Sequence, residues 1–335
     1  LGDVYKRQVS YRIYKLSWLL NKKMRKAKKI VLALPLLLNK MVKRTNWYQN
    51  KLLDKSNYPD NEWYRNHLER NYDVVNLGSS SGVYDFDYTG LNVKAFNWAL
   101  QPQSLEFSFK ILKTYFSILK QKGIVIIPFC PFSGLSVTGK WAEPTYDKYF
   151  DILDRTMIDN YEAVRRRHLY PLFTSPKIAL KKLLKDDPRI KTSRICSKCT
   201  TIQEYEKDSL QWMNIWQKEF NISNLNAPLS EENKLGATYR KHLLSEMIEF
   251  CLVRNLRPVL VMAPVHPTLS TKLTKEFREN YIYSFIREAK PQNVPFWDYL
   301  DDSRFLESSD FDNSFFLSID GARKFTKIVL EDIGV

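Results

Sequence analysis

The sequence predicts an α/β fold in which about five parallel strands form a sheet covered by helices. Five short runs rich in β-branched and aromatic residues alternate with stretches of helical periodicity, which is the pattern of a parallel sheet. Two of these runs, Ile124–Phe129 and Pro258–Met262, are almost continuously apolar, as strands buried on both faces must be. Hydrophobic residues make up 44% of the 335 residues, enough to build a sizeable core.

The elements follow in chain order. The expected strands are Asp73–Leu77, Val93–Trp98, Ile124–Phe129, Pro258–Met262 and Val294–Trp297. Apolar residues at helical spacing predict helices over Leu105–Leu119, Leu235–Cys251 and Ala322–Val329. Ser104 is the expected N-cap of the first of these helices, and Gly123 follows its expected end.

A stretch of about 95 residues, 134–228, interrupts the alternation, too long for a structureless loop. It contains helical patterns such as Gln203–Phe220, so we expect an inserted, mostly helical subdomain within an α/β domain of residues 56–335. The insert follows the carboxyl end of a strand, where open α/β sheets bind ligands. Its tryptophans and tyrosines either form its own small core or stack on sugar rings.

The net charge of +15 belongs to an N-terminal arm. Residues 1–55 contain 15 Lys and Arg against two acids, whereas the remaining 280 residues contain 37 and 35. Bases and apolar residues alternate there beside Trp18, so we expect residues 9–45 to contact an anionic membrane surface. A solvated arm, or a helix docked on the protein's own body, is the alternative. No recognition motif accompanies the charge, so no nucleic-acid partner is expected.

Several function classes are excluded. The ten glycines form neither GxGxxG nor GxxxxGK[ST], which removes dinucleotide-binding and P-loop functions. The longest apolar run near the N-terminus, Ile30–Leu38, is nine residues, short of the ~20 of a spanning helix. Cys130 and Cys251 lie in apolar stretches and are expected in the core, and Cys196 and Cys199 form a lone CxxC. We therefore expect no metal, no cofactor and a reducing compartment.

A candidate site follows the first strand, where the sequence reads Gly78-Ser-Ser-Ser-Gly82. A strand, then Gly-x-Ser, then a helical turn places Ser80 at a helix N-terminus. Backbone N–H groups there favour the oxyanion that a serine nucleophile generates. A capping serine after a tight turn explains the same pattern without a catalytic role.

Three segments resemble the conserved blocks of SGNH/GDSL-type hydrolases and acyltransferases. Leu77–Ser80 resembles the first block, with Ser80 in the nucleophile position, and Ala95–Ser104 resembles the second. Phe311–Thr326, which contains Asp-Gly-Ala, resembles the last, and the order of blocks matches over residues 73–333. The resemblance implies a flavodoxin-like (SGNH) fold. It also implies four residues that line the oxyanion or ligand site: Gly78, Ser79, Asn97 and Gln101.

The chain departs from the family at the positions that carry catalysis. The family's catalytic His falls on Phe316 and its partner Asp on Asn313. The glycine whose N–H helps to form the oxyanion hole falls on Pro102, which has no N–H. The Asn of the third block is missing from Cys130–Ser133.

A substitute base is available among the four histidines. His266 follows the fourth strand and is the candidate base, oriented by Asp298 or by an acid of Asp301-Asp302. A turn histidine near two prolines is the alternative reading of that position. The other histidines are expected at the surface: His67, His168 and His242.

The resemblance is closest to SGNH-like proteins of bacterial surface polysaccharides, including those of alginate O-acetylation and teichoic-acid D-alanylation. It implies a protein of such a pathway that is catalytically degenerate and binds a glycan or a pathway partner. The alternative is an O-acyl (acetyl) transferase or esterase that acts on a surface glycan with Ser80 as nucleophile. The expected partner is a surface glycan or acyl donor. The expected location is the bacterial cytoplasm, peripheral to the inner face of the membrane.

Overall fold

A computed structural model describes residues 33–49, 69–135, 143–185 and 197–335. The chain divides into two compact units. The arm unit comprises residues 1–56 and 160–192, and the sheet unit comprises residues 57–159 and 193–335. The expected insert, 134–228, is therefore divided, because only its residues 160–192 belong with the N-terminal arm.

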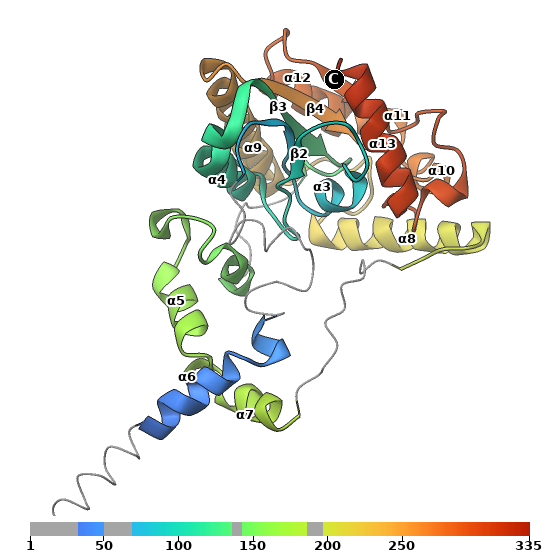
Figure 1. Ribbon diagram of the computed structural model, residues 1–335. Coiled ribbons are helices and arrows are strands. Elements are labelled where there is room, and N and C mark those ends of the chain that lie inside the picture. Colours follow the sequence, from blue (N-terminus) through green and yellow to red (C-terminus); the bar gives the residue numbers. More distant parts are fainter. Residues whose placement is uncertain (1–32, 50–68, 136–142, 186–196) are drawn as a thin grey trace, which may run out of the picture. The chain divides into compact units, whose positions relative to one another are not determined.

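The sheet unit contains one five-stranded parallel sheet with the order β2-β1-β3-β4-β5 (Figure 1). The strands are β1 (Tyr72–Asn76), β2 (Ala95–Asn97), β3 (Leu119–Phe129), β4 (Arg257–Met262) and β5 (Phe296–Asp298). All five predicted strands are present, which confirms the predicted α/β class with a parallel sheet. The order is compatible with a flavodoxin-like arrangement, in which the chain changes direction across the sheet between β1 and β3.

Helices cover both faces of this sheet. They are α3 (Ser80–Asp85), α4 (Leu105–Tyr115), α8 (Ile202–Glu219), α9 (Glu231–Val253), α10 (Pro267–Ser270), α11 (Lys275–Phe277), α12 (Ser284–Ala289) and α13 (Ile319–Asp332). The 3-10 helices are η2 (Phe116–Ile118), η3 (Glu143–Tyr149), η4 (Arg155–Met157) and η6 (Ser308–Asp310), and η5 (Arg278–Tyr283) is a π-helix. On one face, α13 packs Phe325 and Val329 against Ile126. Side chains alternate along β3, so Val125 and Ile127 point to the other face, where α4 packs on α9.

The first predicted helix is correct at its start and wrong at its end. Ser104 caps α4, since its Oγ accepts from the N–H of Phe107 at 3.3 Å. The helix ends at Tyr115, and β3 already begins at Leu119. Gly123 therefore lies inside the strand, where the register with β1 shifts. The apolar spacing continued to Leu119 because that side chain is buried in a strand as it would be in a helix.

The arm unit is built from a helix over residues 33–42 and from α5 (Tyr161–Leu169), α6 (Pro171–Thr174) and α7 (Pro176–Leu184). Asn39 joins the two chain segments, because its Nδ2 donates to Leu169 O at 2.8 Å and its Oδ1 accepts from Leu172 N at 3.1 Å. Val42, Leu172 and Ala179 form a small core. No helix among the described residues is long and apolar enough to cross a membrane.

The predicted positions of the histidines and cysteines are partly correct. His168 is buried, so its expected surface position is wrong; the hydroxyl of Tyr48 donates to its carbonyl at 2.8 Å. His242 is exposed beside Glu246, as expected. Cys251 is fully buried, whereas Cys130 is only half-buried. His67 and Cys196 lie outside the described residues.

Candidate functional site

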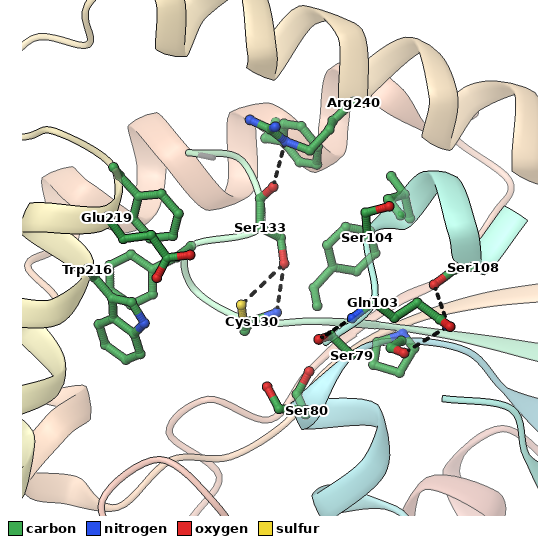
Figure 2. Close-up of a pocket in the computed structure, with 18 of the residues that line it drawn as sticks. Ser79, Ser80, Gln103, Ser104, Ser108, Cys130, Ser133, Trp216, Glu219 and Arg240 are labelled. Atoms are coloured by element: carbon green, nitrogen blue, oxygen red, sulfur yellow. Dashed lines mark hydrogen bonds between the residues drawn. The ribbon is translucent and has the colours of Figure 1, made fainter. Parts of the chain in front are cut away.

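A pocket of about 280 Å³ opens at the carboxyl ends of β1 and β3 (Figure 2). This is the point where the strand order reverses, the position at which open α/β sheets bind ligands. Four regions supply most of its walls: the turn before α3, the start of α4, the segment after β3, and helices α8 and α9. The polar and ionisable lining residues are Ser79, Ser80, Ser81, Gln103, Ser104, Glu106, Ser108, Cys130, Ser133, Glu219, Tyr239 and Arg240.

Two glycines shape the turn that presents the serines. Gly78 has a φ of +121°, a conformation that residues with a Cβ rarely adopt. At Gly82, an added Cβ would lie 2.4 Å from the carbonyl oxygen of Leu77, so α3 approaches the strand too closely for any side chain. Ser80 begins α3 on the pocket wall, and no hydrogen bond of its hydroxyl exists among the described residues.

Gln103 fixes the neighbouring wall. It is buried, and its Nε2 donates to the Gly78 carbonyl and to Ser108 Oγ, both at 3.1 Å. Its Oε1 accepts from the hydroxyl of Tyr149 at 3.1 Å, and its backbone N–H donates to Ser79 Oγ at 3.0 Å. The Ser79 oxygen thus already accepts a hydrogen bond, whereas the hydroxyls of Ser80 and Ser81, which also line the pocket, make no hydrogen bond among the described residues.

The segment after β3 forms a second wall. The backbone N–H of Cys130 donates to Ser133 Oγ at 3.0 Å, and the thiol lies 3.4 Å from that same oxygen. Burial raises the pKa of Cys130, so the thiol stays protonated at neutral pH and is a weak nucleophile. Arg240 holds the segment in place by donating to the carbonyls of Ser133 and Gly134 at 3.1 and 3.2 Å. Burial lowers the pKa of Arg240 to about 10, which keeps it cationic.

Helix α8 supplies an aromatic and acidic wall. Trp216 packs on Phe132 with ring centroids 3.7 Å apart, and Trp212 lies one turn earlier on the same face. Figure 2 shows the Glu219 carboxylate turned toward Cys130 and Ser133. Partial desolvation raises the pKa of Glu219. It has no ion pair among the described residues.

The other carboxylate of the pocket is already engaged. Glu106 accepts from Lys110 Nζ at 2.8 Å and from the Tyr239 hydroxyl at 3.3 Å. Glu219 is therefore the lining carboxylate that remains available to hydrogen-bond a ligand.

His266, the candidate base, is buried away from this pocket. Its ring stacks on Tyr205 at 3.9 Å, and its nitrogens lie 2.9 Å from Thr268 Oγ1 and 3.2 Å from Ser308 Oγ. It caps α10 through Nδ1, which accepts from the Thr268 N–H at 3.3 Å. Burial lowers the pKa of His266. Both ring nitrogens are hydrogen-bonded and His266 does not line the pocket, so its role is to stabilise the turn in which it lies.

The remaining predicted site residues also lie outside the pocket lining. Asp298 accepts from the Tyr283 hydroxyl at 2.7 Å, and Asp301 pairs with Arg278. Asn97 donates to the Gly82 carbonyl at 2.8 Å and so ties α3 to β2. Gln101 precedes the lining residue Gln103 by two positions. Of the seven predicted residues, the structure brings Gly78, Ser79 and Ser80 together and places the other four elsewhere: Asn97, Gln101, His266 and Asp298.

Phenylalanine occupies the position at which the resemblance places the catalytic base, and a second phenylalanine precedes it. The Phe316 ring packs 4.6 Å from that of Tyr84, in the helix that Ser80 begins. Phe315 lines the pocket itself. Asn313 turns its amide oxygen back to the N–H groups of both phenylalanines, each at 2.9 Å. No histidine is among the described residues that line the pocket, so no imidazole there can take a proton from Ser80.

Sequence reasoning found the tryptophans of the opposite wall as residues of the insert that either form its core or stack on sugar rings, but it did not assign them to this site, and it missed Glu219. Trp212, Trp216 and Glu219 lie far along the chain from Ser80 and belong to no motif. A search for aromatic and acidic residues on one face of the predicted helix 203–220 would have selected them, since they fall at positions i, i+4 and i+7.

No protein-family model matches the chain, and no curated protein matches it.

Proposed function

We propose that this chain is a catalytically degenerate SGNH-like protein of a bacterial surface-polysaccharide pathway, and that the pocket binds a glycan. The observation that carries the proposal is the composition of the pocket. Serine hydroxyls face a wall of tryptophans that also carries the Glu219 carboxylate, and no histidine lines the pocket among the described residues. This arrangement supplies hydrogen bonds and stacking for a ligand but no imidazole that could act as the base for Ser80.

The size and chemistry of the pocket favour a small, hydroxyl-rich unit. Its volume of about 280 Å³ lies near the lower end of ligand sites, which suits a single ring or an acyl substituent rather than a long chain. A sugar ring stacks on the aromatic face of Trp216 or Trp212, while Glu219 accepts from its hydroxyls. Glu219 and the cationic Arg240 both line the pocket, so the lining carries one charge of each sign and does not by charge alone exclude a neutral or an acidic sugar.

The proposed location is the bacterial cytoplasm, peripheral to the inner face of the membrane. The basic N-terminal arm supports this location, since cytoplasmic leaflets carry anionic lipids that attract Lys and Arg.

Calorimetric titration of the full chain with oligosaccharides tests the proposal. We expect acetylated oligosaccharides to bind, and Trp216→Ala to weaken that binding by about 10-fold or more. Trp297→Ala is a matched control outside the pocket. Equal affinity of Trp216→Ala and the control, or no binding of any oligosaccharide, would overturn the proposal.

The second candidate is an O-acyltransferase or esterase that uses Ser80. One observation favours it: the Ser80 hydroxyl lies on the pocket wall without a hydrogen bond among the described residues. Hydrolysis of acetylated oligosaccharide that Ser80→Ala removes would establish this activity. Binding without turnover supports the degenerate protein instead.

A further inference from the structure

The arm unit carries nearly all of the protein's excess positive charge. Over residues 1–56 and 160–192 the sequence has 24 Lys and Arg and five acids, a net charge of +19. The sheet unit has 28 bases and 32 acids, a net charge of −4. The internal segment 160–192 alone contributes nine bases, so the basic character is not confined to the N-terminus.

The same unit exposes an unusual amount of apolar surface. Nine of the nineteen exposed large hydrophobic side chains among the described residues belong to it. They are Leu34, Leu36, Leu37, Met41, Tyr170, Phe173, Ile178, Leu180 and Leu184. Leu184 is 91% exposed. Such density in a small unit indicates a surface that is covered in the working protein.

In α7, basic and apolar side chains share the exposed surface. Ala179 is buried against Val42 and Leu172, which fixes the inner face of this helix. Leu180 and Leu184, four residues apart, lie together on an exposed face. Lys177, Lys181 and Lys185 are exposed along the adjoining edge of that helix, and none has an acidic partner among the described residues. This is the pattern of a helix that lies in a membrane interface.

The helix over residues 33–42 repeats the pattern. Leu34, Leu37 and Met41 share an exposed face at helical spacing, while Asn39 and Val42 are buried. Hydrogen bonds between the Asn39 side chain and the backbone of Leu169 and Leu172 hold this helix beside α6 (Figure 1). The two chain segments therefore form one body.

We propose that α7 and the helix over residues 33–42 form a composite surface that docks on an anionic lipid bilayer. The inference rests on the proposed membrane location and adds an internal segment, 176–185, to it. Charge complementarity selects this occupant, since exposed lysines without acidic partners accompany the leucines. The leucines enter the boundary between headgroups and acyl chains, and the lysines contact the anionic headgroups.

Vesicle sedimentation of the full chain tests this surface. The probes are vesicles of phosphatidylcholine with phosphatidylglycerol and vesicles of phosphatidylcholine alone. We expect Lys177→Gln, Lys181→Gln and Lys185→Gln together to weaken binding to the anionic vesicles by about 100-fold, at roughly fivefold per lysine. The charge-matched control replaces three exposed or half-exposed lysines of the sheet unit and leaves binding unchanged: Lys207, Lys275 and Lys290.

A second pair of variants tests the apolar part. Leu180→Gln with Leu184→Gln weakens binding by about 10-fold or more, because both side chains leave water in the bound state. Leu252→Gln with Val253→Gln, at exposed positions of the sheet unit, has no effect. All of these positions are exposed or half-exposed in the structure, so each variant keeps its buried core intact.

The outcomes separate this inference from the proposed location. A variant with five arm lysines changed to glutamine tests the arm alone: Lys22, Lys23, Lys26, Lys28 and Lys29. If that variant loses binding while both α7 variants bind as the wild type does, the composite surface is wrong and the location stands. If the wild-type protein does not bind anionic vesicles, both the composite surface and the proposed location are wrong. If the leucine variant instead dissociates an oligomer seen without vesicles, a second copy covers this face and the inference is overturned.

Discussion

Asp208 anchors the helix that carries the aromatic wall of the pocket. Its Oδ2 accepts from the backbone N–H of Ser314 at 3.0 Å and from the Ser314 hydroxyl at 2.6 Å. Both residues are buried, with Asp208 8% exposed and Ser314 fully enclosed. Bonds of this kind to a carboxylate are short and stronger than neutral ones.

Asp208→Ala removes the acceptor and leaves two buried donors of Ser314 unsatisfied. Each unsatisfied donor costs about 1–3 kcal/mol, so the free energy of unfolding falls by about 3 kcal/mol. For a body of this size, that corresponds to a decrease in Tm of about 6–12 °C. Asp208→Asn keeps one acceptor oxygen and loses only the charge, so it costs about 1 kcal/mol.

Urea denaturation followed by circular dichroism measures these differences. Asp320→Ala is the matched control, because that carboxylate is 93% exposed and is expected to change stability by less than about 0.5 kcal/mol. Asp208→Ala also loosens α8, so binding of oligosaccharide at Trp212 and Trp216 weakens with it. Equal stability of the Asp208→Ala and Asp320→Ala variants would refute this account of how α8 is held.

Burial lowers the pKa of His266 in the folded protein. The free energy of unfolding should therefore not depend on this histidine above its unfolded pKa of about 6.5, and it should fall as the pH drops from there through the folded pKa. His266→Gln should flatten this pH dependence in urea titrations. Ile127→Asp buries an unpaired charge opposite Leu260 and should cost at least about 4 kcal/mol, whereas unchanged melting would contradict the strand assignment. Turnover of p-nitrophenyl acetate should stay near background and be unaffected by His266→Ala, and robust turnover abolished by Ser80→Ala would show that the pocket has a base after all.

Local patterns in the sequence were enough to predict the sheet and one wall of the site. Apolar runs such as Ile124–Phe129 predict buried parallel strands because hydrophobic burial is a local, periodic property. The Gly-Ser-Ser turn after the first strand is equally local, since Gly78 and Gly82 are required by backbone geometry and close approach. The expected position of Ser80 at the start of a helix therefore agrees with the structure.

The side chains that face Ser80 are set by contacts between segments far apart in the sequence. Glu219 and Trp216 come from α8, which Asp208 ties to Ser314, 106 positions away in the sequence. His266 follows a strand at the same edge, but stacking on Tyr205 turns it into the interior. Periodicity reports which side of an element is buried and not which distant side chain meets it. Contacts across long sequence separations thus placed both the aromatic wall and the histidine.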